Sequence, residues 1–276
     1  MLDHLDGRTR LHVLIGHPIA QVKSPPGVTR LLQQRGHNAV MVPVHVEPGD
    51  VDALLSALST VRNLDGIIAT VPHKFALYRH AATASSRAHV LGAANIARRN
   101  NDGSWHADML DGLSMATAIV TAGGRIDGQR ALLAGAGGAG GAIALSLLEA
   151  GVERLAIYDI DPGRRDALIA RLQMRFGTRV EVGTADPSGC NLVVNATPAG
   201  MQPADPLPVM AERLTPDMFV ADVITEPVVT PLLQAARRAG CGTQTGVGMY
   251  EAALDLMVDF LRGAASDLTA HDSGAR

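Results

Sequence analysis

The stretch from residue 130 to residue 161 constrains the fold more than any other part of the chain. It reads RALLAGAGGAGGAIALSLLEAGVERLAIYDID. The apolar residues 130–134 predict a buried strand, the Ala- and Leu-rich residues 138–150 a helix, and the apolar residues 154–158 a second strand. Two short strands joined by a helix predict a βαβ unit, in which both strands lie parallel in one sheet.

The turn between the first strand and the helix has the spacing G-x-G-x-x-G, at Gly135, Gly137 and Gly140. The first glycine permits a tight turn, the second lets backbone N–H groups approach a pyrophosphate, and the third lets the helix pack closely on the sheet. The start of the helix adds unpaired N–H donors and a partial positive charge. The motif predicts dinucleotide binding, and the alternative interpretation is a glycine-rich turn without a ligand. The residues expected to contact the cofactor here are Gly135, Ala136, Gly137, Gly138, Ala139 and Gly140.

The second strand ends at Asp159, roughly 20 residues after the glycines, where a carboxylate can bond the ribose hydroxyls of NAD. Its negative charge would repel the 2′-phosphate of NADP. Asp159 therefore favours NAD, with NADP as the less favoured cofactor.

Length and composition are those of a globular α/β protein with two domains. The 276 residues are enough for two cores, and 47% hydrophobic with 18% charged residues excludes a disordered chain. The net charge of −3, without a basic run, gives no reason to expect nucleic acid or a membrane as a partner. The N-terminus has no apolar signal segment and no stretch reaches the ~20 apolar residues of a membrane span, so we expect a cytoplasmic protein.

The region before the βαβ unit alternates strand-like and helix-like segments, which predicts a second, mostly parallel sheet. A helix is expected over 82–90 and a strand over 92–98. The last helix, 249–261, has apolar residues at i, i+3, i+4 and i+7 and is expected to pack back on the first domain.

A dinucleotide site implies hydride transfer, and oxidising an alcohol requires a base that accepts the hydroxyl proton. Lys74 in ATVPHK and Asp111 in MLDG are candidates, because both follow strands, and ligands of open α/β sheets bind at the carboxyl ends of strands. A carboxylate beside a lysine would orient its ammonium group. The alternative interpretation is a solvated lysine and an aspartate that caps the helix starting near Gly112.

Motifs distributed over nearly the whole chain resemble those of the shikimate/quinate dehydrogenase family. They are GHPIAQVKSP (16–25), TVPHK (70–74), LGAAN (91–95), LDG (110–112), GAGGAG (135–140), NATPAGM (195–201), DVITEPVVTPLL (222–233) and GVGM (246–249). The resemblance implies an α/β fold with an N-terminal substrate domain, a C-terminal Rossmann domain and a cleft between them. The expected boundaries are 1–111 plus 247–276 for the substrate domain and 112–246 for the Rossmann domain.

The resemblance also assigns roles to residues. It implies a catalytic pair of Lys74 and Asp111, with Ser24, Thr70 and Asn95 binding the substrate. Further cofactor contacts are implied for Asn195, Thr197, Met201, Val223 and Gly246.

Several positions depart from the family pattern. Val22 replaces the first serine of the carboxylate clamp, and other polar residues of the family are replaced by Ile96, Met109, Leu110, Thr225 and Ala253. Each lost neutral hydrogen bond weakens the binding of a hydroxyl-rich acid by about 0.5–1.5 kcal/mol. The chemistry is thus retained in the sequence, while the residues that read the substrate are changed.

The cofactor turn departs as well. NADP-using members carry an Asn-Arg-Thr-type turn whose arginine grips the 2′-phosphate, whereas this chain has Asp159, Ile160 and Asp161. We predict an NAD(P)-dependent dehydrogenase, NAD being preferred, that interconverts shikimate and 3-dehydroshikimate or quinate and 3-dehydroquinate. The alternatives are the same chemistry on a different, less polar hydroxy acid, and a non-catalytic NAD-sensing protein. No metal site is expected, the partner is a small hydroxy acid, and a homodimer is the oligomer considered.

Overall fold

The computed structural model describes residues 5–20 and 22–263, and the chain folds into two compact units. Unit 1 consists of Met1–Ser85, Ala94–Asp108 and Leu254–Arg276, and unit 2 of Ser86–Ala93 and Met109–Ala253. Residues 86–93, 109–111 and 247–253 thus join unit 2 by their contacts. The functional division predicted from the sequence places them with the substrate domain, and that division stays a prediction.

Unit 1 is built on a six-stranded mixed sheet in the order β2-β1-β3-β5-β6-β4. Its strands are β1 (Arg10–Gly16), β2 (Ala39–His45), β3 (Leu64–Ala69), β4 (Thr83–Ala84), β5 (Ile96–Arg99) and β6 (Trp105–Asp108). Its helices are α1 (Ser24–Gln34), α2 (Val51–Leu58), α3 (Lys74–His80) and the C-terminal part of α9 (Gly246–Leu261). β1 pairs in parallel with β2 and β3, whereas β5 runs antiparallel to β3 and to β6. The sheet is therefore less parallel than the sequence predicts.

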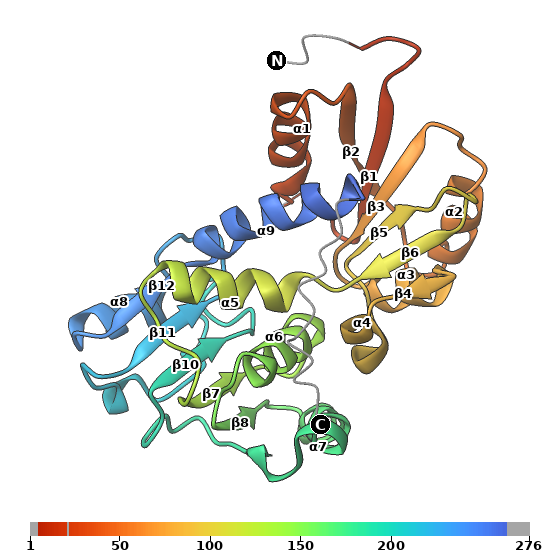
Figure 1. Cartoon of the computed structure of the whole chain (residues 1–276). Coiled ribbons are helices and arrows are strands. Elements are labelled where there is room, and N and C mark those ends of the chain that lie inside the picture. Colours follow the sequence, from red (N-terminus) through yellow and green to blue (C-terminus); the bar gives the residue numbers. More distant parts are fainter. Residues whose placement is uncertain (1–4, 21, 264–276) are drawn as a thin grey trace, which may run out of the picture. The chain divides into compact units, whose positions relative to one another are not determined.

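Helices cover both faces of this sheet (Figure 1). Val13, Ile15 and Ile67 belong to a buried cluster that also contains Leu55 of α2 and Leu77 of α3. α1 packs against β1 and β2, and the end of α9 reaches β3. A Cβ atom on Gly66 would lie 2.3 Å from Cδ2 of Leu261, so the absence of a side chain in β3 lets α9 approach. The predicted return of the last helix to the first domain is confirmed for its C-terminal part.

Unit 2 contains a second, fully parallel sheet in the order β12-β11-β10-β7-β8-β9. Its strands are β7 (Arg130–Ala134), β8 (Arg154–Tyr158), β9 (Val180–Val182), β10 (Leu192–Asn195), β11 (Phe219–Asp222) and β12 (Gly242–Gln244). Its helical segments are α4 (Ser86–Leu91), α5 (Asp111–Thr121), α6 (Gly138–Glu149), α7 (Pro162–Phe176), η1 (Gly177–Arg179), η2 (Ala211–Arg213), α8 (Pro231–Arg238) and the first part of α9. Read from β9, this is the strand order of a doubly wound dinucleotide-binding fold.

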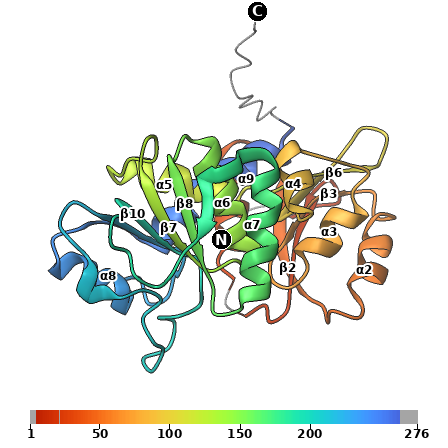
Figure 2. The same ribbon diagram turned by 90° about the horizontal axis from the view of Figure 1, so that it is seen from below.

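The helices of unit 2 connect its parallel strands and pack against the sheet. α6 and α7, which connect β7 to β8 and β8 to β9, lie side by side in Figure 2. α8 packs against β11 and β12. The point where the strand order reverses lies between β7 and β10, and ligands of such sheets bind beyond the carboxyl ends of the strands there. The predicted βαβ unit is confirmed, with β8 ending one residue before Asp159.

The region from residue 82 to residue 98 differs from the prediction. The expected helix over 82–90 is shortened to α4, because Thr83 and Ala84 pair with β6 as the short strand β4. The expected strand over 92–98 begins only at Ile96. Ala-rich composition favours helix locally, and tertiary pairing with β6 overrides that preference.

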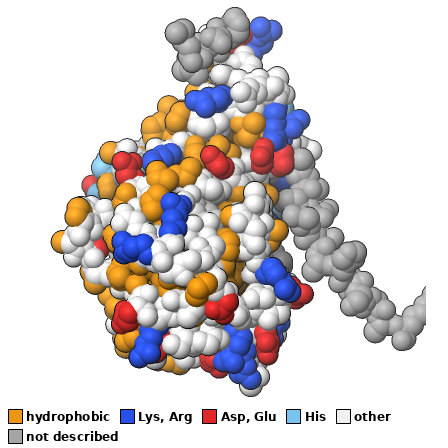
Figure 3. Space-filling view, turned by 90° about the vertical axis from the view of Figure 1, so that its left-hand side faces the viewer, with side chains coloured by type: hydrophobic (Ala, Val, Ile, Leu, Met, Phe, Trp, Pro, Cys, Tyr) orange, Lys and Arg blue, Asp and Glu red, His pale blue; other side chains and the backbone are white. Residues whose placement is uncertain are grey.

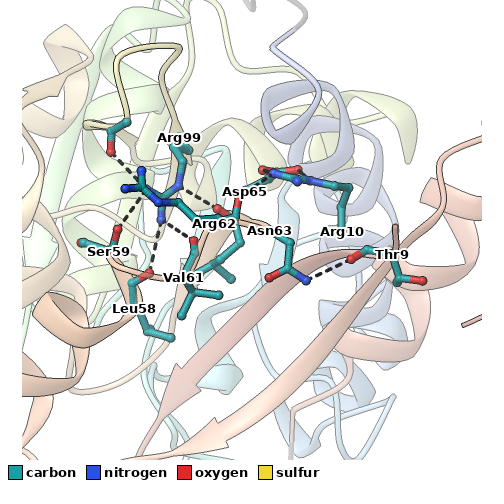
Figure 4. A network of polar contacts seen from close by, with 11 residues as sticks. Thr9, Arg10, Leu58, Ser59, Val61, Arg62, Asn63, Asp65 and Arg99 are labelled. Carbon is teal, nitrogen blue, oxygen red and sulfur yellow. Dashed lines mark hydrogen bonds and ion pairs between the residues drawn. The ribbon is translucent and has the colours of Figure 1, made fainter. Parts of the chain in front are cut away.

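Arg99 ties the loop after α2 to the sheet of unit 1 (Figure 4). Its guanidinium donates to the carbonyl oxygens of Leu58 (3.2 Å), Ser59 (3.1 Å), Val61 (3.1 Å), Leu64 (2.8 Å) and Gly103 (3.3 Å). It also lies over the ring of Trp105, 4.5 Å from the ring centroid. A single side chain therefore satisfies the carbonyls at the C-terminal end of α2 that no helical N–H can reach.

No helix within residues 5–20 and 22–263 is long and apolar enough to cross a membrane. On the face in Figure 3, basic and acidic side chains are interspersed with hydrophobic ones. Because charges of both signs are mixed, the described residues of this face create no broad field of one sign.

His12 is a buried titratable group in the core of unit 1. Its Nδ1 has no hydrogen-bond partner among the described residues, and a Cβ on Gly66 would lie 2.5 Å from it. Burial lowers the pKa of His12 to about 4 from its usual 6.5, and the charge of Arg10 adds to this, although Asp65 opposes it. The imidazole ring of His12 is therefore neutral in the folded protein at neutral pH.

We expect this group to weaken the fold in mild acid. The folded pKa lies below the unfolded pKa, so the unfolded chain binds the proton first and stability falls as the pH drops from 6.5 to 4. Full titration corresponds to a loss of about 3 kcal/mol. Urea denaturation of wild type and His12→Leu at pH 7 and pH 4.5 measures this difference. Equal losses in both proteins would contradict the assignment to His12.

Candidate functional site

The glycine turn after β7 is tightly packed at two of its three motif positions. Gly135 has φ +103°, a conformation that residues with side chains rarely adopt, and its N–H donates to the carbonyl oxygen of Tyr158 (2.7 Å). A Cβ on Gly140 would lie only 2.0 Å from the carbonyl oxygen of Gly135. Gly135 therefore requires glycine because of its positive φ, and Gly140 because α6 approaches β7 closely.

Gly137 differs from the other two glycines. A Cβ on it would meet no atom within 4 Å, and its φ of −75° suits any residue. It is the N-cap residue of α6 and makes no side-chain cap, so no cap side chain occupies the N–H groups of the first helical turn. Open space beside Gly137 together with unused N–H donors fits the pyrophosphate of a dinucleotide. Ala136 is buried, and Gly138 and Ala139 begin the helix.

Asp159 connects the end of β8 to this turn. Its Oδ2 accepts the N–H of Ala136 (2.7 Å) and its Oδ1 accepts the N–H of Asp161 (2.9 Å). The residue is only 8% exposed. Each carboxylate oxygen has a second lone pair, so Asp159 can accept further bonds from ribose hydroxyls. Arg164 lies 3.6 Å from the carboxylate of Asp161 and 4.0 Å from that of Asp159.

Asn195, at the end of β10, organises the loop that follows it. Its Oδ1 accepts the N–H (3.0 Å) and the hydroxyl (2.7 Å) of Thr197, and its Nδ2 donates to Asp222 (3.1 Å). The hydroxyl oxygen of Thr197 in turn accepts the N–H of Ala199 (3.1 Å). The amide of Asn195 therefore fixes the loop against the next strand.

Asp222 is a buried residue of this network that the sequence patterns did not single out, whereas its neighbour Val223 was named as a cofactor contact. It is fully buried at the end of β11, where it also accepts the hydroxyl of Thr230 (2.7 Å) and the N–H of Ile224 (3.0 Å). Burial raises its pKa to about 6, although the hydrogen bonds lower it. The sequence signal that could have identified Asp222 is its position at the end of a predicted strand. β10 and β11 pair in register at Asn195 and Asp222, so both residues end neighbouring parallel strands.

Val223 and Gly246 lie close to this network, whereas Met201 is exposed. The N–H of Val223 donates to the carbonyl oxygen of Asn195 (3.1 Å). A Cβ on Gly246 would lie 2.3 Å from the carbonyl oxygen of Ile224 and 2.5 Å from that of Val223. Met201 is 45% exposed after the positive-φ residue Gly200. The carboxyl ends of β10 and β11 thus gather Asn195, Val223 and Gly246 from distant parts of the sequence.

The substrate-binding candidates Thr70 and Asn95, and the catalytic candidate Lys74, meet at one edge of the sheet of unit 1. Thr70 directly follows β3, and Asn95 directly precedes the antiparallel strand β5. The carbonyl oxygen of Asn95 accepts the N–H of Ala69 (2.8 Å), and that of Lys74 accepts the N–H of Ala94 (3.0 Å). Asn95 is 2% exposed, while Thr70 and Lys74 are half-buried. The reversal of β5 brings these three residues together.

The remaining candidates lie in two places. Ser24 is the first residue of α1 in unit 1, and both it and Val22 are half-buried. Asp111 is the first residue of α5 in unit 2, where Leu110 holds the N-cap position, so the interpretation of Asp111 as the capping residue is wrong. Lys74 and Asp111 belong to different units, and their pairing stays a prediction.

The sequence of the chain matches known proteins over most of its length. Residues 14–97 match the family model described as the shikimate dehydrogenase substrate binding domain. A curated shikimate dehydrogenase (NADP(+)) of Rubrobacter xylanophilus is 37% identical over 88% of this chain and 87% of its own. The chain belongs to the shikimate dehydrogenase family. It is an NAD(P)-dependent dehydrogenase of the shikimate/quinate dehydrogenase type, as the sequence predicts.

Solved structures agree with this family. Quinate dehydrogenase from Corynebacterium glutamicum, in complex with NAD, is 28% identical with a TM-score of 0.82, covering 92% of this chain and 94% of the other. The ligand-free form of 5-ketofructose reductase of Gluconobacter sp. strain CHM43 is 25% identical with a TM-score of 0.85, covering 94% of each chain. The two-domain α/β fold class with a Rossmann domain is thereby confirmed.

Two glycine substitutions separate packing from cofactor binding. Gly140→Ala places a methyl group against the carbonyl of Gly135, so we expect a loss of about 1–3 kcal/mol in unfolding free energy. Gly137→Ala meets open space and should change stability by less than about 0.5 kcal/mol. The added methyl group should nevertheless weaken NADH binding by about tenfold, or roughly 1.4 kcal/mol.

Urea denaturation and NADH fluorescence titration measure the two effects. Gly49→Ala is the control, because a Cβ at Gly49 also meets open space and Gly49 belongs to unit 1, away from the glycine turn in the sequence. This variant should change neither the unfolding free energy nor the NADH affinity. Unaltered NADH affinity in Gly137→Ala would argue against the pyrophosphate at this turn.

Proposed function

We propose that this protein interconverts shikimate and 3-dehydroshikimate, or quinate and 3-dehydroquinate, with NAD as the preferred cofactor. The observation that carries the proposal is the grouping of Thr70, Lys74 and Asn95 at one sheet edge, in a chain of this family. A dehydrogenase needs a proton-transfer group and hydroxyl-binding groups close together, and these three residue types supply both.

Each residue has a distinct part in the proposed reaction. Lys74 accepts the hydroxyl proton during oxidation and returns it during reduction, and Asp111 orients its ammonium group. Asn95 and Thr70 hold ring hydroxyls, and Ser24 donates to the substrate carboxylate. When bound, the nicotinamide accepts or supplies the hydride. Gly137, Asp159 and Asn195 are the residues of unit 2 that would hold the dinucleotide.

A second candidate is the same chemistry on a less polar substrate. Val22 removes one hydroxyl donor from the carboxylate clamp, and Met109 and Leu110 are buried apolar residues in place of polar ones. One structural relative is a 5-ketofructose reductase, and the name of its substrate denotes a keto sugar rather than a carboxylic acid. Parallel assays with shikimate, quinate and neutral polyols, in both directions, distinguish the two candidates, because only a carboxylate-reading site discriminates against the neutral compounds.

The Lys74→Ala variant tests the proposed chemistry. General acid–base catalysis contributes about 10²–10⁴-fold, so kcat/KM should fall by at least about 100-fold. NADH binding should remain as in wild type, because Lys74 belongs to unit 1 and the dinucleotide residues to unit 2. Arg79→Ala, an exposed substitution on the same helix α3, is the matched control and should retain activity. Wild-type turnover in Lys74→Ala would reject the assignment.

The preference for NAD rests on the turn after β8. The named relative from Rubrobacter uses NADP(+), but the turn here carries carboxylates at Asp159 and Asp161, and Ile160 between them is 89% exposed. Two negative charges oppose a 2′-phosphate, and Ile160 offers it no donor. Arg164 lies beside the carboxylates of Asp159 and Asp161, and these charges weaken the attraction of its guanidinium for a 2′-phosphate.

We expect wild type to have the higher kcat/KM with NAD. Ile160→Arg should shift the ratio of the two kcat/KM values toward NADP by at least about tenfold, since guanidinium pairs strongly with phosphate. Ile160→Ala controls for loss of the isoleucine and should leave the ratio unchanged. A wild-type preference for NADP would refute the cofactor assignment without affecting the substrate assignment. A cytoplasmic location and a homodimer stay predictions from the sequence.

A further inference from the structure

Three metal-ligating side chains gather beyond the carboxyl ends of β1 and β2 in unit 1. His17 directly follows β1, His45 ends β2, and Glu47 comes two residues later. One ligand atom of each lies within 4.8 Å of the others. The reaction proposed above uses none of the three.

The topology explains why these residues meet. β1 and β2 are parallel and in register at Gly16 and His45, and the N–H of Val46 donates to the carbonyl oxygen of Gly16 (3.3 Å). The chain therefore leaves both strands at the same sheet edge. No short spacing in the sequence reveals the cluster, because nearly the whole of α1 and β2 separates His17 from His45.

The distances suit a tetrahedral metal centre. Nδ1 of His17 lies 2.9 Å from Nε2 of His45 and 3.5 Å from Oε2 of Glu47. Bonds of about 2.0–2.1 Å to zinc at tetrahedral angles place neighbouring ligand atoms roughly 3.3 Å apart. The two observed separations bracket this value, and the third is below 4.8 Å, so the three ligands can converge on one ion when bonds to the metal replace the hydrogen bond between the two rings.

The chemistry of the ligands narrows the choice of ion. Two imidazole nitrogens and one carboxylate oxygen suit zinc and similar first-row dications, rather than the all-oxygen ligand sets of calcium or magnesium. The two rings meet edge to edge through these nitrogens, with centroids 5.1 Å apart and planes inclined by 20°. The carboxylate is 63% exposed and the His17 side chain 36%, so an ion can enter from solvent.

We propose that His17, His45 and Glu47 form a binding site for a zinc-class divalent metal ion, with its fourth position open to water or an oxygen ligand. The site adjoins the loop after β3, because the N–H of His17 donates to the carbonyl oxygen of Val71 (3.0 Å). A metal site was not expected from the sequence. The proposal does not depend on the identity of the substrate or of the cofactor.

The test is calorimetric titration of the tag-free full chain, stripped of metal with a chelator, using zinc chloride alone. Cobalt(II) absorption in the visible range reports the ligand geometry independently. His45→Gln and Glu47→Gln should each weaken zinc binding by at least about tenfold, since even the loss of a residue that only hydrogen-bonds a metal ligand commonly costs that much. Both positions are exposed, so the melting temperature of each variant without metal should match that of wild type. This measurement distinguishes a folding defect from the loss of a metal ligand.

His106→Gln is the matched control, because His106 lies in the same unit and bonds Thr83 instead. It should bind zinc as wild type does. Saturable binding that both ligand variants weaken, together with tetrahedral cobalt absorption, would support the site. Absence of saturable zinc binding in wild type, or equal affinity in all four proteins, would overturn it.

Discussion

The dinucleotide half of the chain depends on one close backbone approach, between the end of β7 and the start of α6. Gly140 lies against the carbonyl of Gly135 at a distance that no side chain would allow. This contact places the first turn of α6 at the edge of the sheet, where the N–H of Ala136 reaches Asp159. The N–H donors of this turn and the carboxylate of Asp159, which we propose to hold the dinucleotide, are therefore positioned by the same packing contact.

Buried hydrogen bonds extend this arrangement to the neighbouring strands. A carboxylate inside a protein is costly unless donors satisfy it, and Asp222 has donors from Asn195, Thr230 and the backbone. Its pKa is raised to about 6, so burial destabilises the charged carboxylate more than these hydrogen bonds stabilise it. Because Asp222 and Asn195 end adjacent strands, their bond fixes the loop after β10 relative to the loop after β11.

Unit 1 uses its sheet edge differently. Three parallel strands, β1, β2 and β3, end at one edge, and the antiparallel strand β5 begins there. Residues just outside the strands, such as Thr70 and Asn95, can therefore carry chemistry while the sheet beneath them keeps its packing. Residues outside the strands, such as Val22, can differ from the family pattern without disturbing the buried strands.

The sequence by itself determined the elements whose local signals agree. The strand, glycine turn, helix and second strand of residues 130–158 form as predicted, because glycine chemistry and apolar periodicity both specify them. The family motifs likewise identified the enzyme type, since each matches a short segment with a fixed role. Lys74 could be named as a candidate because it stands in such a motif, and Asp159 because it follows the second strand of the βαβ unit.

Only the tertiary structure decided what depends on contacts between distant segments. β4 forms in an Ala-rich segment because β6 supplies backbone partners, which no local preference can indicate. Asp222 bonds Asn195, and His17 meets His45, because parallel strands far apart in sequence end side by side. A sequence records which side chains a chain carries and how each segment prefers to fold. The pairing of strands decides which of those side chains become neighbours, because pairing energy is gained only when separate segments meet.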